Sequence, residues 1–97
     1  MNDAFLLFVQ ITPKQEYYDQ AKAALLSIID QTRNEKGCYQ FELTQGESDA
    51  SLFLYEEWAN QQALDEHYAQ PYIVHVFQKY EQWLSCPVEI TRLRKVA

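Results

Sequence analysis

The sequence lacks the features that mark disulfide frameworks, phosphate-binding loops and membrane-spanning segments. Its two cysteines, Cys38 and Cys86, lack C-x-x-C spacing and are too few for a disulfide framework. Its two glycines, Gly37 and Gly46, form no glycine-rich loop for a phosphate or dinucleotide. No apolar run approaches the roughly 18 residues that span a bilayer, and the N-terminus lacks the pattern of a signal peptide. We therefore expect a soluble, cytoplasmic protein with no membrane partner.

Positive charge is also scarce. Eight basic residues stand against 14 acidic ones, which gives a formal net charge of −6. Nucleic acids and anionic membranes are bound through basic patches, so we expect neither as the main partner. Arg92, Arg94 and Lys95 do cluster near the C-terminus. They form either a solvated strand edge or a clamp for an anionic substrate.

Aromatic residues, in contrast, are abundant for a chain of 97 residues, with seven tyrosines, five phenylalanines and two tryptophans. A chain of this length predicts one domain, residues 1–97, that can bury a core without metals or disulfides. The two histidines, His67 and His75, have neither the spacing nor the third ligand of a metal site. We expect no metal and no bound cofactor.

Hydrophobic periodicity predicts four strands, at Ala4–Ile11, Cys38–Thr44, Leu52–Trp58 and Val88–Val96. The first and third are apolar on both faces. In the second, Tyr39, Phe41 and Leu43 share one face.

Capping residues predict the helices between these strands. Thr12 as N-cap, with Pro13 at the first helical position, begins a helix that runs to about Asn34, and Gly37 is the left-handed stop after it. Asn60 caps a short helix that carries His67. A further helix begins at Pro71 and covers roughly Tyr72–Leu84.

The resulting order is β-α-β-β-α-β with a split second helix. This order predicts an α+β, ferredoxin-like fold, an antiparallel sheet with helices on one face. Because two strands are apolar on both sides, the uncovered face would be a large apolar patch, which soluble monomers rarely expose. We therefore expect a homodimer formed through that sheet face.

The candidate site residues come from the third strand and from the short helix that follows it, and we expect them to converge. Alternation along the strand places Glu56 and Trp58 on one face, and helical spacing turns His67 inward. His67 is either a general base or a core histidine bonded to a carbonyl or to Glu56. Trp58 is either a pocket wall or a core residue, and Glu56 either a site acid or a structural partner.

With these residues in view, the chain resembles the antibiotic biosynthesis monooxygenase (ABM) family of the dimeric α/β-barrel superfamily. The resemblance lies in four stretches, Glu35–Phe41, Phe53–Trp58, Ala63–His67 and Gln70–Tyr72. The family includes cofactor-independent monooxygenases of aromatic polyketides or quinols, haem-degrading enzymes and an isomerase of a phosphorylated sugar. Its glutamate, tryptophan and helix histidine correspond to Glu56, Trp58 and His67.

The chain departs from the family pattern at two places, and these departures reduce the number of family activities that we expect. Tyr72 stands where relatives often have a histidine, which counts against a mechanism that needs two pocket histidines. Leu7 stands where the haem-degrading branch has asparagine, and the haem ligand position, near Val76 or Phe77, holds no histidine. We expect no haem degradation.

The leading hypothesis is a monooxygenase that oxidises a small electron-rich aromatic, such as a hydroquinone or anthrone, with O2. Its catalytic candidates are His67, Trp58 and Glu56, and its substrate-binding candidates are Tyr72, Phe41 and Phe77. The alternative is a non-catalytic dimer that binds a small metabolite, or an isomerase of the same fold. An open space lined by Trp58, His67 and Tyr72 would favour the enzyme, and a filled one the alternative.

Overall fold

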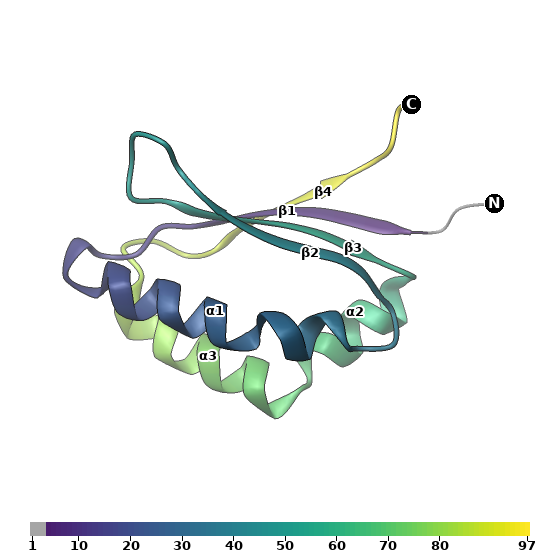
Figure 1. The fold of residues 1–97 in the computed structure, drawn as a ribbon, viewed down its shortest axis with the longest axis horizontal. Coiled ribbons are helices and arrows are strands. Elements are labelled where there is room, and N and C mark those ends of the chain that lie inside the picture. Colours follow the sequence, from purple (N-terminus) through teal and green to yellow (C-terminus); the bar gives the residue numbers. More distant parts are fainter. Residues whose placement is uncertain (1–3) are drawn as a thin grey trace.

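The computed structural model describes residues 4–97. In chain order the elements are β1 (Phe5–Ile11), the 3-10 turn η1 (Gln15–Tyr17), α1 (Tyr18–Arg33), β2 (Cys38–Gln45), β3 (Leu52–Trp58), α2 (Gln61–Tyr68), α3 (Pro71–Trp83) and β4 (Glu89–Leu93). The strands form one antiparallel sheet in the order β2-β3-β1-β4, with all helices on one face (Figure 1). The predicted ferredoxin-like α+β fold with a split second helix is confirmed. The sheet of this single chain is open and does not close into a barrel.

The core fills the space between the sheet and its helices. The strands contribute Leu7, Val9, Ile11, Phe41, Leu52, Leu54 and Trp58, and the helices Ala21, Leu25, Ile28, Leu64, Ile73, Val76 and Tyr80. Burying a large apolar side chain stabilises the fold by roughly 1.5–3 kcal/mol. The Tyr80 hydroxyl donates to the Ala21 carbonyl at 2.9 Å, which fixes α3 against α1. Within residues 4–97, no helix is long and apolar enough to cross a membrane.

The described helices all lie on one side of the sheet and leave its other face uncovered (Figure 1). Phe8 on β1 and Phe53 on β3 stack there with ring centroids 5.5 Å apart, and Phe8 is 41% exposed. Leu6, Tyr55 and Leu93 point to the same side by their register in the sheet. The strands are thus apolar on both faces, as the sequence predicted.

The predicted helix start at Thr12 and Pro13 is wrong. Residues 12–14 run alongside residues 83–85: Pro13 forms a β-bridge with Leu84, and the Ser85 N–H donates to the Thr12 carbonyl at 2.9 Å. This tertiary pairing holds the segment extended, so that η1 and then α1 begin only after it. A local capping pattern is overridden here by backbone contacts more than 70 residues away in sequence.

The predicted left-handed conformation of Gly37 is also wrong, because no described residue has a positive φ. Glycine is needed at this position for space. A methyl group at Gly37 would overlap the Cβ of Ala63 on α2. The Ala59 N–H also donates to the Gly37 carbonyl at 2.8 Å, so the α1–β2 turn is seated directly on the start of α2.

Two strands differ in detail from the prediction. The register of β2 against β3 shifts between Cys38 and Gln40, and this irregularity takes Tyr39 out of the expected alternation. Phe41 is therefore buried, whereas Tyr39 is 65% exposed instead of sharing its face. The last strand is shorter than expected, because β4 covers only Glu89–Leu93.

The close approach of Gly37 to α2 predicts a large cost for adding a methyl group. Gly37→Ala should lower the free energy of unfolding by about 1–3 kcal/mol, the usual cost of overpacking, because the turn must lift from α2. Urea unfolding followed by circular dichroism measures this cost. Gly46→Ala is the matched control, since its methyl group would meet chiefly the end of the Asp49 side chain, which can turn away at the cost of its hydrogen bond from the Ser51 N–H. Equal losses in the two variants would contradict the argument.

Candidate functional site

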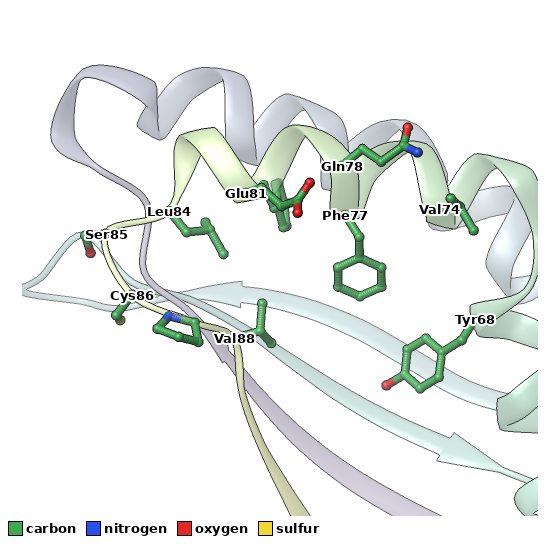
Figure 2. A pocket seen from close by; sticks show the side chains of 11 residues that line it. Tyr68, Val74, Phe77, Gln78, Glu81, Leu84, Ser85, Cys86 and Val88 are labelled. Carbon is green, nitrogen blue, oxygen red and sulfur yellow. The ribbon is translucent and has the colours of Figure 1, made fainter.

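A groove of about 770 Å³ opens between α3 and the segment that leads into β4 (Figure 2). Its lining is mostly apolar and aromatic, with Glu81 and Gln78 as polar exceptions on α3. The side chains of Tyr68, Phe77 and Val88 lie between α3 and the sheet (Figure 2). A hollow of this size, with apolar walls and few polar groups, suits a small organic molecule.

Behind the groove lies an inner cavity of about 30 Å³. Tyr68, Phe77, Tyr80 and Val88 line both spaces, so these side chains form the wall between them. The cavity is bordered by His67 and Glu56 as well as by apolar side chains that include Phe41. It has room for about one water molecule and no organic ligand. Two of the predicted substrate-binding residues, Phe41 and Phe77, therefore border a hollow.

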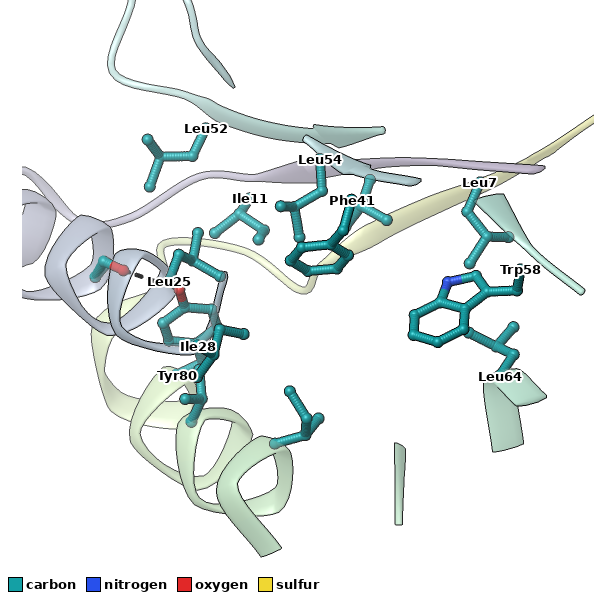
Figure 3. Packing of buried hydrophobic residues seen from close by; sticks show 14 residues of the cluster. Leu7, Ile11, Leu25, Ile28, Phe41, Leu52, Leu54, Trp58, Leu64 and Tyr80 are labelled. Carbon is teal, nitrogen blue, oxygen red and sulfur yellow. Dashed lines mark hydrogen bonds between the residues drawn. The ribbon is translucent and has the colours of Figure 1, made fainter. Parts of the chain in front are cut away.

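Trp58 is fully buried and lines neither hollow. Leu7, Trp58 and Leu64 lie together at one end of the core (Figure 3). The indole Nε1 donates to Glu56 Oε1 at 2.9 Å. Strand alternation therefore does bring Glu56 and Trp58 to one face, where Trp58 fills space and satisfies a buried carboxylate.

Glu56 is only 3% exposed in the middle of β3. Burial raises the pKa of its carboxyl from 4.5 to about 7, since the charged form loses water. The Trp58 hydrogen bond lowers this pKa and the negative charge of Glu35 raises it, both more weakly than burial acts. Glu56 can therefore exchange a proton near neutral pH.

His67 lies on the buried face of α2 and is 3% exposed. Burial lowers the pKa of its imidazole, and the hydrogen bond and charge of Glu35 act in the opposite direction. Its Nδ1 is 2.8 Å from Glu35 Oε2, so the partner is neither a carbonyl nor Glu56. The rings of Trp58 and Tyr68 lie 4.6 Å and 5.4 Å from the imidazole, centroid to centroid.

Tyr72 reaches the same carboxylate from the first turn of α3. Its hydroxyl donates to Glu35 Oε2 and lies 3.4 Å from Thr32 Oγ1. Burial and then Glu35 raise the pKa of Tyr72 to about 12, so it remains a neutral donor. Tyr72 borders neither the groove nor the inner cavity. Tyr72 is linked to His67 by the Glu35 carboxylate, which both side chains contact.

Glu35 and Tyr68 both contact His67, as do Trp58 and, through Glu35, Tyr72; together with Glu56 these residues form the cluster around His67. Sequence reasoning missed two of its members, Glu35 and Tyr68. Glu35 lies in a turn, where no periodicity predicts the direction of a side chain. It does stand within the first stretch that resembles the ABM family, and this was the available signal. Tyr68 follows His67 directly and forms part of the wall between the hollows.

The remaining candidates lie away from this cluster. His75 is exposed on α3. The Arg92 guanidinium lies 3.8 Å from the centre of the Phe5 ring, an arrangement typical of a cation–π contact. Within residues 4–97, no three metal-ligating side chains come together.

Comparison with known proteins identifies the family of the chain. The model of the antibiotic biosynthesis monooxygenase family matches residues 4–79. The chain belongs to the antibiotic biosynthesis monooxygenase family. The matched range contains all the residues of the cluster and both helices of the split pair, except the end of α3.

Two relatives of this ABM chain illustrate the range of similarity. "Putative monooxygenase Rv0793" of Mycobacterium tuberculosis is 27% identical over 93 residues, which cover 96% of this chain and 92% of the relative. "Uncharacterized protein sll1783" of Synechocystis is 29% identical over 97 residues, and the chain spans only 65% of its length.

Solved structures show the same fold. The structure of Rv0793 has a TM-score of 0.91 at 26% identity, with 97% of this chain and 96% of that chain covered. The structure of PA3566 from Pseudomonas aeruginosa has a TM-score of 0.93 at 24% identity, with 100% and 98% covered.

The raised pKa of Glu56 predicts how stability depends on pH. Between about pH 4.5 and 7 the folded protein keeps a proton that the unfolded chain has lost, so Glu56 makes the free energy of unfolding fall as pH rises. Above pH 7 this effect amounts to about 3 kcal/mol. Glu56→Gln cannot ionise, so its stability relative to the parent should rise from pH 5 to pH 8.

Urea unfolding of parent and variant at pH 5 and pH 8 measures this difference, in which the contribution of His67 largely cancels. Glu66→Gln, on the exposed side of α2, is the control and should follow the parent. A parent and Glu56→Gln that change in parallel with pH would show that the carboxyl titrates normally.

Proposed function

We propose that this ABM protein is a cofactor-independent monooxygenase that oxidises a small electron-rich aromatic, such as a hydroquinone or anthrone, with O2. The observation that carries the proposal is the buried imidazole of His67, on the wall of an apolar cavity that a thin aromatic partition separates from an open groove. Membership of the family supports the reaction class. The apolar surroundings support a reaction in which water must be excluded.

His67 is the base in this reaction. It takes a proton from the phenol or from the activated carbon of the substrate, and the phenolate or carbanion then donates an electron to O2. One oxygen atom ends in the product, a hydroxyquinone or quinone, and the other leaves as water. The substrate itself supplies all the electrons, so the balance requires no external reductant.

The aromatic ring of the substrate occupies the groove. Phe77 and Tyr68 must turn aside for it to reach His67, because the inner cavity holds no more than about one water molecule. Phe77 is 39% exposed, which leaves it room to move. Glu56, with a pKa near 7, is the second group that can exchange a proton in this space.

One observation favours the alternative, a non-catalytic small-metabolite-binding dimer or an isomerase. The space between Trp58, His67 and Tyr72, whose openness would have favoured the enzyme, is filled by packed side chains. The neighbouring groove is open. Binding of an aromatic molecule without oxygen consumption would favour this alternative over the oxidation.

The partner that we propose is a second copy of the chain. The uncovered sheet face, with Phe8 stacked on Phe53, supports a sheet-to-sheet homodimer in which two open sheets build the α/β barrel. Nucleic acid is not proposed as a partner, given the net charge of −6. The cytoplasmic location remains a prediction from composition.

Removing the proposed base should abolish most of the activity. His67→Ala should lower oxygen consumption with a reduced naphthoquinone or an anthrone by about 10²-fold or more, the usual scale for loss of a general base. An oxygen electrode measures the rate, and circular dichroism checks the fold. His75→Ala is the matched control, because that histidine is exposed on α3. A folded His67→Ala variant with the parent's activity would refute the site, and an unfolded one would favour a purely structural histidine.

The homodimer can be tested separately. The parent should sediment with the mass of two chains at micromolar concentration, and Phe8→Glu should sediment as one chain, because it places an unpaired charge in the apolar contact. Analytical ultracentrifugation measures both masses. Leu26→Glu, on the exposed side of α1, is the control for a new surface charge. A parent that sediments as one chain would contradict the homodimer.

A further inference from the structure

Glu35 is the hub of a polar cluster that the proposed reaction does not yet use. Its Oε2 atom accepts a hydrogen bond from the Tyr72 hydroxyl and lies 2.8 Å from His67 Nδ1. The three residues come from the α1–β2 turn, α2 and α3. The Glu35 side chain is 14% exposed and that of His67 is 4% exposed, so the pair is largely shielded from water.

The backbone places Glu35 firmly at this point. Its N–H donates to the Thr32 carbonyl at 3.0 Å, and its carbonyl accepts from the Cys38 N–H at 3.0 Å. Two residues on, Gly37 rests against Ala63 of α2. Ala63 and His67 are four residues apart and hence share one helix face. Because the α1–β2 turn packs against Ala63, Glu35 in that turn lies close to His67.

We infer that Glu35 is a positioning residue for His67: its carboxylate holds the proton on Nδ1, leaves Nε2 as the basic nitrogen, and stabilises the imidazolium that forms when Nε2 takes a proton. The catalytic part of this inference rests on the proposed function. An ionised carboxylate can only accept, so the 2.8 Å contact requires the proton on Nδ1. Among residues 4–97, no hydrogen bond to Nε2 is present to compete with a substrate.

The other titratable groups on elements packed around His67 are less suited to this role. Glu56 on β3 already accepts from the Trp58 indole, and burial raises its pKa to about 7. Burial raises the pKa of Tyr68 on α2 and of Tyr72 on α3 to about 12, and that of Cys38 on β2 to about 11, so all three are neutral. Glu35 is therefore the group that can offset a charge on His67.

An NMR titration tests the pairing without any substrate. In the parent, the ¹⁵N shifts of His67 should show the Nδ1–H tautomer. In Glu35→Gln the pKa of His67 should fall by about 1 or more, because the opposite charge is lost while the shape is kept. His75, the other histidine of the chain, serves as the internal reference in every spectrum. Glu66→Gln, on the exposed side of α2, is the control and should leave His67 unchanged.

Tyr72→Phe provides a test of opposite sign. Without the Tyr72 hydroxyl, the Glu35 carboxylate is no longer shared and accepts more strongly from His67, so the pKa of His67 should rise. A cluster in which Glu35 places no charge beside His67 would not produce shifts of opposite sign in these two variants. If Glu35→Gln fails to fold, Tyr72→Phe carries the test alone. An unchanged or lowered pKa in Tyr72→Phe would then overturn the inference.

Measurements of oxygen consumption test the catalytic part of the inference about Glu35. With a reduced naphthoquinone, Glu35→Gln should lower kcat/KM by about tenfold or more and shift the lower limb of the pH profile to lower pH. An Nε2–H tautomer in the parent, or an unchanged pKa in a folded Glu35→Gln, overturns the inference about Glu35. A parent with the expected tautomer and pKa changes but no oxygen consumption overturns the proposed function alone and leaves the pairing established.

Discussion

The contact between Gly37 and Ala63 is the constraint on which the site depends. It brings the turn after α1 against the face of α2, and the backbone bond between Ala59 and Gly37 holds it there. In this arrangement the Glu35 carboxylate lies 2.8 Å from Nδ1 of His67 and gives the buried ring its partner. Because Gly37 has no side chain, the turn can pack against α2, and this packing sets the surroundings of the buried His67 imidazole.

The polar groups around the core are arranged so that little charge is buried at neutral pH. Burial favours the protonated form of Glu56 and the neutral form of His67. Each also has a hydrogen-bond partner, the Trp58 indole for Glu56 and the Glu35 carboxylate for His67. No described buried side-chain polar atom lacks a partner. Within residues 4–97, Glu56 Oε1 and His67 Nδ1 are therefore both satisfied, whereas Nε2 of His67 is left for a further partner.

Much of this arrangement could be predicted from the sequence, because it depends on periodicity. The alternation in Leu52–Trp58 places Glu56 and Trp58 together, and helical spacing turns His67 inward. The failures share a physical cause. The extended segment at Pro13, the position of Gly37 and the direction of Glu35 are all decided by contacts with distant parts of the chain. The hollows are likewise bounded by side chains from several elements, so no local pattern reports their size.

The pairing of residues 12–14 with residues 83–85 has a consequence for how a ligand would enter. It anchors the strand-like segment that forms one wall of the groove: the Thr12 carbonyl accepts from Ser85 at 2.9 Å and the Lys14 N–H donates to Trp83 at 2.8 Å. With that wall fixed, the partition gives way most easily at the half-exposed ring of Phe77. Rotation of an exposed side chain takes picoseconds to nanoseconds, whereas hinge motions take microseconds to milliseconds. Turning of the Phe77 ring alone would therefore be fast on the timescale of ordinary enzyme turnover.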